Sequence, residues 1–264
     1  LLAAENPRIN TGQVARTQEG LDLLVELAEL LQVPVNGVSN RLNFPSRHPL
    51  QGTGTGTPDL ILNLEPGSRV GTSPSSPRST GRQAQATDAP NVTTITISSA
   101  EFLVTSNFNV FGNGAGNADL VVAADAQSTL PALIEEVRRL MTSDRKAFLQ
   151  DRGTKIASAH LRARRRTITD ARYGWDNSPV SLPRLAAEVW PHIKDLDWSF
   201  VSPQRFLGNW PSHLWDMNKT YHFIGAHGAG GMGYGAPAAV GAALANRKHG
   251  RISINIQGDG DLNY

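Results

Sequence analysis

The chain has 264 residues, of which 39% are hydrophobic, and this is enough for a buried core in one or two domains. A formal net charge of +2 gives no general attraction to nucleic acid or to a membrane surface, so neither is expected as a partner. The absence of cysteine excludes disulfides, thiolate metal sites and cysteine nucleophiles. We expect a cytoplasmic protein, because no apolar run reaches transmembrane length and the first residues lack the regions of a signal peptide.

Residues 1–141 alternate short β-type segments with amphipathic helices, as a parallel sheet covered by helices does. The clearest helix is expected at 20–32, where Leu21, Leu24, Val25, Ala28 and Leu31 repeat at helical spacing and Pro34 follows. A second helix is expected at 130–141, and strands at 6–12, from Val33, and at 59–64, 93–97 and 119–123. Arg8 and Asn10 weaken the first strand as a core strand. The sequence therefore predicts an α/β fold that opens with a three-layer, parallel-sheet domain.

Two loops of this first domain could carry chemistry. The repeat GTGTGT at 52–57 could bind phosphate but lacks the Lys of a P-loop, so we interpret it as a flexible connection. The segment 65–88 that follows the next strand is rich in Ser and Pro, and we interpret it as a long loop. His48 lies between Arg47 and Pro49 without a partner that the sequence shows, and a structural or exposed role is favoured.

Residues 142–177 form a basic stretch that we interpret as a helical linker. The run Arg164 to Arg166 has no aromatic residues interleaved with it, which favours a solvated face over a nucleic-acid site. A second domain, residues 178–264, is expected to begin with a helix at 181–193 and a strand at 198–201. Its tryptophans are expected to form one aromatic cluster, made of Trp190, Trp198, Trp210 and Trp215.

The most informative stretch is 225–264, where a loop poor in side chains precedes a small-residue helix that starts near Pro237. The glycines of this loop are Gly225, Gly228, Gly230, Gly231, Gly233 and Gly235. A strand is expected at 251–257, where isoleucines alternate with polar residues, and it delivers Gly258-Asp259-Gly260-Asp261 at its carboxyl end. A carboxylate between glycines suits a Mg²⁺ ion that is shared with phosphates, so Asp259 is the predicted metal ligand.

These motifs resemble the thiamine diphosphate enzymes related to acetolactate synthase, pyruvate oxidase and benzoylformate decarboxylase. The resemblance implies that Asp259 binds Mg²⁺ with an Asn beyond Tyr264, because Asn263 is too close to the acid. It also implies that Met232 holds the cofactor bent and that the Gly230 carbonyl receives the aminopyrimidine amine. Asp261 departs from the Ser or Ala of relatives. The cofactor-binding residues implied are Gly230, Gly231, Met232, Gly258, Asp259, Gly260 and Asp261.

The resemblance also implies an activity, which is decarboxylation or acetolactate-synthase-like carboligation of a 2-oxo acid in a homodimer or homotetramer. The activating Glu of the family would lie before Leu1, so the chain would be a central domain followed by a truncated diphosphate-binding domain, inactive alone. No catalytic residue is assigned within the chain; His227 is a candidate for substrate contact or proton relay, and a structural role is favoured for it. Some relatives hold FAD or a nucleotide in the central domain, but no residue here assigns FAD.

Two alternatives stay open. Residues 228–233 satisfy GxGxxG and Asp259 ends a later strand, as in a Rossmann-type oxidoreductase that binds a dinucleotide. That reading leaves the second glycine pair and Asp261 unexplained. The other alternative is a degenerate family member that only dimerises and has no catalytic role.

Overall fold

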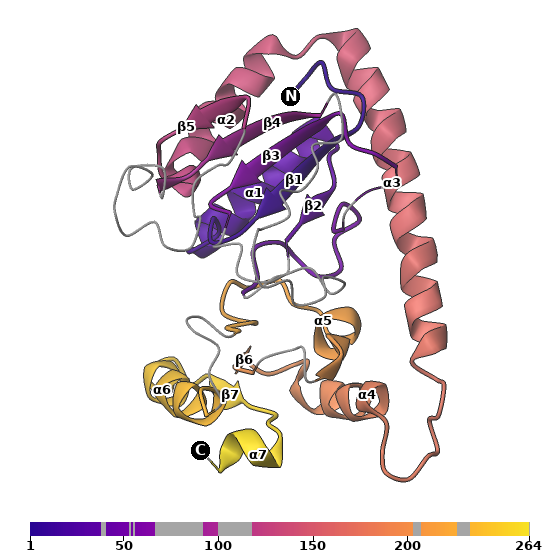
Figure 1. Cartoon of the computed structure of the whole chain (residues 1–264), viewed down its shortest axis with the longest axis vertical. Coiled ribbons are helices and arrows are strands. Elements are labelled where there is room, and N and C mark those ends of the chain that lie inside the picture. Colours follow the sequence, from indigo (N-terminus) through magenta and orange to yellow (C-terminus); the bar gives the residue numbers. More distant parts are fainter. Residues whose placement is uncertain are drawn as a thin grey trace, which may run out of the picture.

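A computed structural model describes the backbone of most of the chain and shows two parallel sheets, each with flanking helices, joined by one long helix (Figure 1). The predicted α/β class is confirmed. The side chain of Asp261 is not described. The described residues are 1–37, 41–52, 54, 56–66, 92–99, 118–202, 207–225 and 233–263.

The first sheet has five parallel strands in the order β2-β1-β3-β4-β5. Its first strand was expected to be weakened by Arg8 and Asn10, and this is wrong, because β1 pairs with β2 on one side and β3 on the other. The side-chain amide of Asn10 donates to Oδ1 of Asn63 on β3 at 3.2 Å, so this polar residue is satisfied inside the sheet. The strands are β1 (Pro7–Thr11), β2 (Val35–Asn36), β3 (Leu60–Leu64), β4 (Thr93–Ile97) and β5 (Leu120–Val122).

Two helices, α1 (Gln18–Leu31) and α2 (Ala126–Leu140), pack side by side and share a core with the strands. The hydroxyl of Thr17 begins α1 by accepting a hydrogen bond from the Gly20 amide at 3.0 Å. Asp125 caps α2 in the same way through the Ser128 amide, at 2.8 Å, so α2 starts four residues earlier than predicted. The third predicted layer falls on the chain between β3 and β5, of which residues 67–91 and 100–117 lie outside the described residues.

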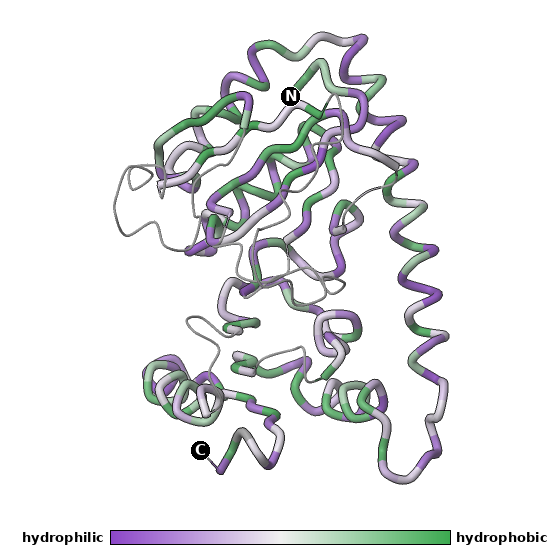
Figure 2. Tube along the Cα trace, in the orientation of Figure 1, coloured by the Kyte–Doolittle hydropathy of each residue, from purple (hydrophilic) through white to green (hydrophobic). Residues whose placement is uncertain are grey.

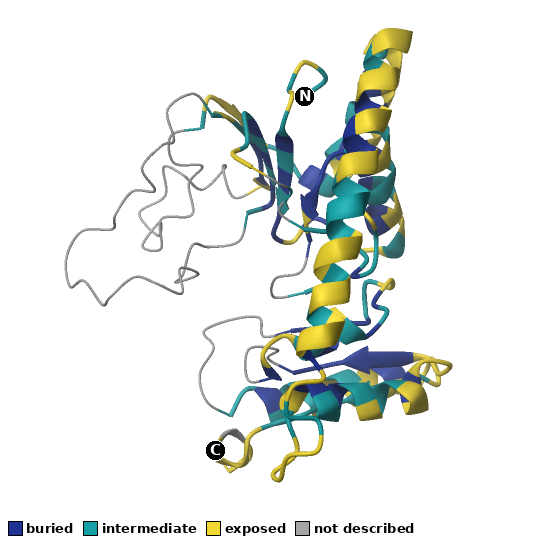
Figure 3. Ribbon diagram, turned by 90° about the vertical axis from the view of Figure 1, so that its right-hand side faces the viewer, coloured by how far each residue is buried: buried dark blue, intermediate teal, exposed yellow. Residues whose placement is uncertain are grey.

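The long helix α3 (Ser143–Asp170) runs along one side of the molecule, from the first sheet to the second (Figure 1). Most of its residues are exposed or half-buried (Figure 3), hydrophilic residues alternate with apolar ones along it (Figure 2), and Arg162, Arg165 and Arg166 are all exposed. Arg164 reaches the second unit, which is the part of the chain around the second sheet. There its Nη1 donates to the His213 carbonyl at 3.4 Å. Within the described part of the chain no helix is long and apolar enough to cross a membrane.

The second unit is built on two parallel strands, β6 (Trp198–Phe200) and β7 (Ile252–Ile254). Trp198 and Trp215 are buried with ring centroids 5.6 Å apart, and Trp190 lies 6.4 Å from Trp215. Trp210 was predicted in this cluster but contacts the ring of His213 instead, because the two residues lie three positions apart on one short helix. The helices are α4 (Leu182–Ile193), α5 (Trp210–Leu214), α6 (Gly235–Arg247) and α7 (Asp259–Leu262).

His222 makes the stability of this second core depend on pH. Its ring stacks on Trp198 with centroids 4.1 Å apart, Nδ1 accepts from the Asn218 amide at 3.2 Å, and burial lowers its pKa to about 4. The folded pKa lies below the unfolded value of about 6.5, so the unfolded chain gains a proton first as the pH falls. We expect the free energy of unfolding to decrease between about pH 6.5 and pH 4, by on the order of 2 kcal/mol from this residue.

Urea unfolding of the wild type and of His222→Gln at pH 7 and pH 4.5 measures this effect. The variant should lose less stability over the same interval. Some loss should remain, because burial also lowers the pKa of His160 and His213. Equal losses in the two proteins would show that His222 does not cause the acid sensitivity.

Candidate active site

A loop of the first unit, which is the part of the chain around the five-stranded sheet, forms hydrogen bonds with the residues that precede the glycine-rich segment. The hydroxyl of Ser46 donates to the Trp215 carbonyl at 2.9 Å and accepts from the Met217 amide at 3.0 Å. The Leu42 amide donates to the Phe223 carbonyl at 3.2 Å. The first unit therefore fixes residues 215–223, immediately before the glycine-rich segment begins.

Three parallel chain segments end together at one edge of the small sheet. Residues 223–224 lie beside β6, where the Ile224 amide donates to the Phe200 carbonyl at 2.9 Å. On the other side β6 pairs with β7, and the Val201 amide donates to the Ile254 carbonyl at 2.8 Å. Because the carboxyl ends of parallel strands form the ligand-binding edge of open α/β sheets, this edge is the candidate site. The glycine-rich segment starts there, and the Gly-Asp-Gly segment follows β7 there.

The predicted strand at 251–257 is shorter in the structure, since β7 ends at Ile254. After Ile254, side chains rather than a neighbouring strand form the hydrogen bonds with the backbone. The Asn255 side-chain amide donates to the Val201 carbonyl at 2.5 Å and to the Gly235 carbonyl at 3.2 Å, and the Ser202 hydroxyl donates to the Ile256 carbonyl. The prediction of a strand up to Gln257 is therefore wrong, and the reason is that Asn255 and Ser202 bind the backbone groups that a ladder would use.

Asp259 begins the one-turn helix α7 directly after Gly258. Gly258, Asp259 and Gly260 are exposed, and a Cβ atom on either glycine would meet nothing within 4 Å. No described residue forms a hydrogen bond or ion pair with the Asp259 carboxylate. An exposed, unpaired carboxylate with open space on both sides fits the binding of a hard cation such as Mg²⁺.

Among the described residues, Asp259 is the predicted protein ligand of this cation. No group of three or more His, Cys, Asp or Glu side chains that could hold a metal occurs among them. Mg²⁺ commonly takes one or two carboxylates and completes its octahedron with waters and substrate phosphates, so a single Asp is compatible with such a site.

The other predicted site residues are only partly described. His227, Gly230, Gly231 and Met232 lie outside the described residues, so their roles stay predictions. Asp261 contributes its backbone to α7. His48, by contrast, has structural partners, because its Nδ1 accepts from the Leu50 amide at 3.1 Å and its Nε2 lies 3.3 Å from Oε1 of Glu29.

The sequence did not predict a role for Gln257, whose side chain packs closely against α6. A Cβ atom on Gly235 would lie 1.7 Å from Nε2 of Gln257, so the carboxamide occupies the space beside the first residue of α6. Both Oε1 and Nε2 of Gln257 are buried and have no hydrogen-bond partner in the part of the chain that the structure describes. Burying unsatisfied polar atoms costs about 1–3 kcal/mol.

Gln257→Leu should therefore raise the free energy of unfolding, by about 1 kcal/mol, because leucine keeps the bulk and removes the two unsatisfied atoms. Urea unfolding measures the change. Gln257→Glu is the control and should lower stability, since it buries a charge at the same place. A Leu variant less stable than the wild type would show that the carboxamide is hydrogen-bonded in solution.

A second ligand position in such folds is the crevice between β1 and β3, where the strand order reverses. Here Oε1 of Gln127 accepts from the amides of Arg16 and Thr17, at 2.8 and 3.3 Å. These amides lie at the start of α1 and are the groups that would otherwise bind a phosphate. The amides of the turn after β1 are thus hydrogen-bonded to Gln127 and are not free to bind a phosphate.

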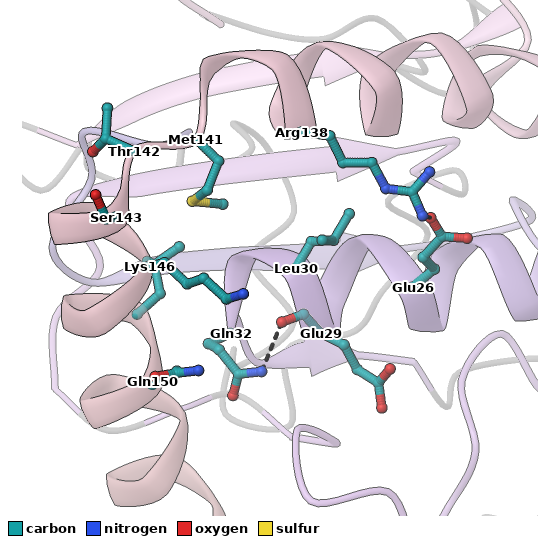
Figure 4. Close-up of a pocket in the computed structure, with 11 residues that line it drawn as sticks. Glu26, Glu29, Leu30, Gln32, Arg138, Met141, Thr142, Ser143, Lys146 and Gln150 are labelled. Carbon is teal, nitrogen blue, oxygen red and sulfur yellow. Dashed lines mark hydrogen bonds and ion pairs between the residues drawn. The ribbon is translucent and has the colours of Figure 1, made fainter.

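A cavity of about 540 Å³ lies between the C-terminal half of α1, the end of α2 and the start of α3 (Figure 4). It contains the ion pair of Glu26 with Arg138, at 2.5 Å, and the side chains of Lys146 and Met141. The cavity belongs to the first unit and shares no lining residue with the candidate site.

Comparisons with known proteins place the candidate site within a stretch that matches a known family. Residues 207–264 match the family model described as thiamine pyrophosphate enzyme, C-terminal TPP binding domain. The resemblance to thiamine diphosphate enzymes is confirmed. Over 53 residues, 20% of this chain and 8% of the relative, the sequence is 39% identical to acetolactate synthase 2, chloroplastic, of Brassica napus.

Three solved structures share the fold along the chain. A 4-hydroxybenzoylformate decarboxylase of Rhodococcus jostii RHA1 is 21% identical (TM-score 0.63), and the match covers 100% of this chain and 45% of that one. An enzyme of Mycobacterium smegmatis described as a thiamin diphosphate-dependent enzyme is 19% identical (0.65; 99% and 47%). Benzoylformate decarboxylase of Polynucleobacter necessarius is 19% identical (0.63; 100% and 45%). The chain thus spans less than half of each solved structure.

Proposed function

We propose that the protein to which this chain belongs is a thiamine diphosphate- and Mg²⁺-dependent enzyme that acts on a 2-oxo acid. The observation that carries the proposal is the carboxylate of Asp259, at the carboxyl edge of a parallel sheet. It is exposed, has no partner among the described residues and lies between two unobstructed glycines. This carboxylate lies within the residues that match the thiamine pyrophosphate enzyme model.

The proposed roles of the chain's own residues follow from this placement. Asp259 holds the cation, and Gly258 and Gly260 leave room for the phosphates beside it. Met232 and Gly230 orient the cofactor's ring system, as the family resemblance implies. When bound, thiamine diphosphate supplies the electron sink for breaking or forming a bond at the 2-oxo carbon.

Within this class we favour an acetolactate-synthase-like carboligation over simple decarboxylation. The similarity to acetolactate synthase 2 supports this choice, whereas two of the named solved structures are decarboxylases. We further propose a homodimer or homotetramer that works in the cytoplasm. We also propose no turnover by the 264 residues alone, because the family resemblance implies an activating Glu and a second Mg²⁺ ligand that these residues do not supply.

Calorimetric titration of the full-length protein tests the proposal. Thiamine diphosphate should bind in the presence of Mg²⁺, and chelation of Mg²⁺ by EDTA should abolish the binding. A parallel titration with NAD addresses the dinucleotide alternative at 228–233. Binding of NAD without binding of thiamine diphosphate would replace the proposed function by that alternative, and binding of neither would favour a non-catalytic member of the family.

A further inference from the structure

Two side-chain amides connect the parts of the candidate site. Asn255 and Gln257 are two residues apart, immediately before Gly258, and both contact Gly235 at the start of α6. α6 follows the glycine-rich segment, whereas Gly258 begins the segment that carries Asp259. The contacts therefore join the two stretches of sequence that the proposed function requires to act on one cofactor.

Asn255 makes the connection through hydrogen bonds. One nitrogen, Nδ2, donates to the carbonyl of Val201 at 2.5 Å and to that of Gly235 at 3.2 Å. Val201 follows the last residue of β6, and Gly235 is the first residue of α6. A single side chain thereby links the ends of β6 and β7 with the start of α6, at the ligand-binding edge of the sheet.

Gln257 makes the connection by packing. Its carboxamide lies so close to Gly235 that a Cβ atom there would be 1.7 Å from Nε2. The hydroxyl of Ser202 also donates a hydrogen bond to the carbonyl of Ile256, the residue before Gln257. The backbone between Asn255 and Gln257 is therefore fixed from two directions just before it reaches Asp259.

We propose that Asn255 is a positioning residue that sets the spacing between Gly235, at the start of α6, and the Gly258–Gly260 turn, and thereby the affinity for the diphosphate and its cation. This inference rests on the proposed function. In Asn255→Asp, a carboxylate oxygen would face the carbonyls of Val201 and Gly235, and both hydrogen bonds would become repulsive contacts. We expect roughly tenfold weaker cofactor binding, because the loss of both hydrogen bonds would release the Gly258–Gly260 turn from the start of α6.

Ser253 provides a matched control. Its hydroxyl accepts from Nδ2 of Asn246 at 2.8 Å, and this bond also joins β7 to α6. Asn246 lies in the last turn of α6, at the end away from Gly235. Ser253→Ala thus removes a hydrogen bond between the same two elements without touching the edge that carries Asp259.

The experiment measures the dissociation constant of thiamine diphosphate at saturating Mg²⁺, by calorimetry, for the full-length wild type and both variants. Thermal unfolding of the proteins without cofactor is recorded beside it. Both variants should lower the unfolding temperature, but only Asn255→Asp should weaken cofactor binding, by about tenfold, and Ser253→Ala should stay within about twofold. In steady-state assays the KM for the cofactor should rise in Asn255→Asp, whereas the KM for the substrate at saturating cofactor should not change.

The outcomes separate this inference from the function on which it rests. A wild type that binds no thiamine diphosphate would overturn both. A wild type that binds, together with an Asn255→Asp protein of equal affinity, would overturn the positioning role alone, as would equal losses in the two variants. If Asn255→Asp does not fold, Asn255→Ser keeps one donor, and it should bind the cofactor more weakly than both the wild type and Ser253→Ala.

Discussion

Replacing Asp259 by alanine should weaken the binding of thiamine diphosphate to the full-length protein by roughly a hundredfold in the presence of Mg²⁺. The carboxylate is exposed and engages no described residue, so its removal should leave the fold intact. The cation would lose a charged oxygen ligand, and no other group of potential metal ligands among the described residues could replace it. Asp259→Asn, which keeps an oxygen ligand without the charge, should show a smaller loss.

The measurement is a calorimetric titration with thiamine diphosphate at fixed Mg²⁺, with unfolding by urea as a check on the fold. Asp195→Ala is the control, because Asp195 is also a well-exposed acid of the second unit, beside Lys194 and away from the candidate site. It should bind the cofactor as the wild type does. Wild-type affinity in the Asp259→Ala protein would remove this residue from the site.

The elements of the fold could be predicted where a periodic pattern is long enough. The alternating run at 93–97 is β4 with the predicted bounds, and the stripe from Leu21 to Leu31 is the buried face of α1. α5 was missed because five residues are too few to show a helical period. The position of β1 was misjudged because a polar residue in a central strand depends on a partner, Asn63, that lies 53 residues away.

The site could be predicted as far as its chemistry is local in the sequence. A carboxylate between two glycines after a strand is a local pattern, and it indicates Asp259 as the candidate metal ligand. The contacts of Asn255 and Gln257 could not be predicted in this way, because alternation with isoleucines predicts that polar residues face solvent. In the structure Ser253, Asn255 and Gln257 all contact α6, so the polar side of this segment is the side that a helix covers. Which side is covered depends on packing between elements, and the alternation alone does not encode it.

The buried position of Arg152 could not be predicted from the composition of its segment. It is one of many basic residues at 142–177, predicted as a solvated face, but it is buried. Its guanidinium donates to the carbonyls of Ala4, Leu31 and Gln32, at 2.8, 2.5 and 3.1 Å, and at 3.2 Å to that of Glu5. It thus binds the C-terminal end of α1 and the segment before β1. Burial lowers its pKa to about 10, which still leaves it charged at neutral pH.

Arg152→Met should lower the free energy of unfolding by about 3 kcal/mol, since the carbonyls of Glu5, Leu31 and Gln32 lose this donor while an apolar stem of similar length is kept. The carbonyl of Ala4 keeps its hydrogen bond from Arg145. Urea unfolding at pH 7 measures the loss. Arg162→Met is the matched control on the same helix, because Arg162 is exposed, and its effect should stay within about 0.5 kcal/mol. A similar loss in the two variants would mean that α3 needs positive charge in general. A loss confined to Arg152→Met would show that one arginine of the basic stretch fixes α3 against the first sheet, and therefore that the residues between 142 and 177 do more than connect two units.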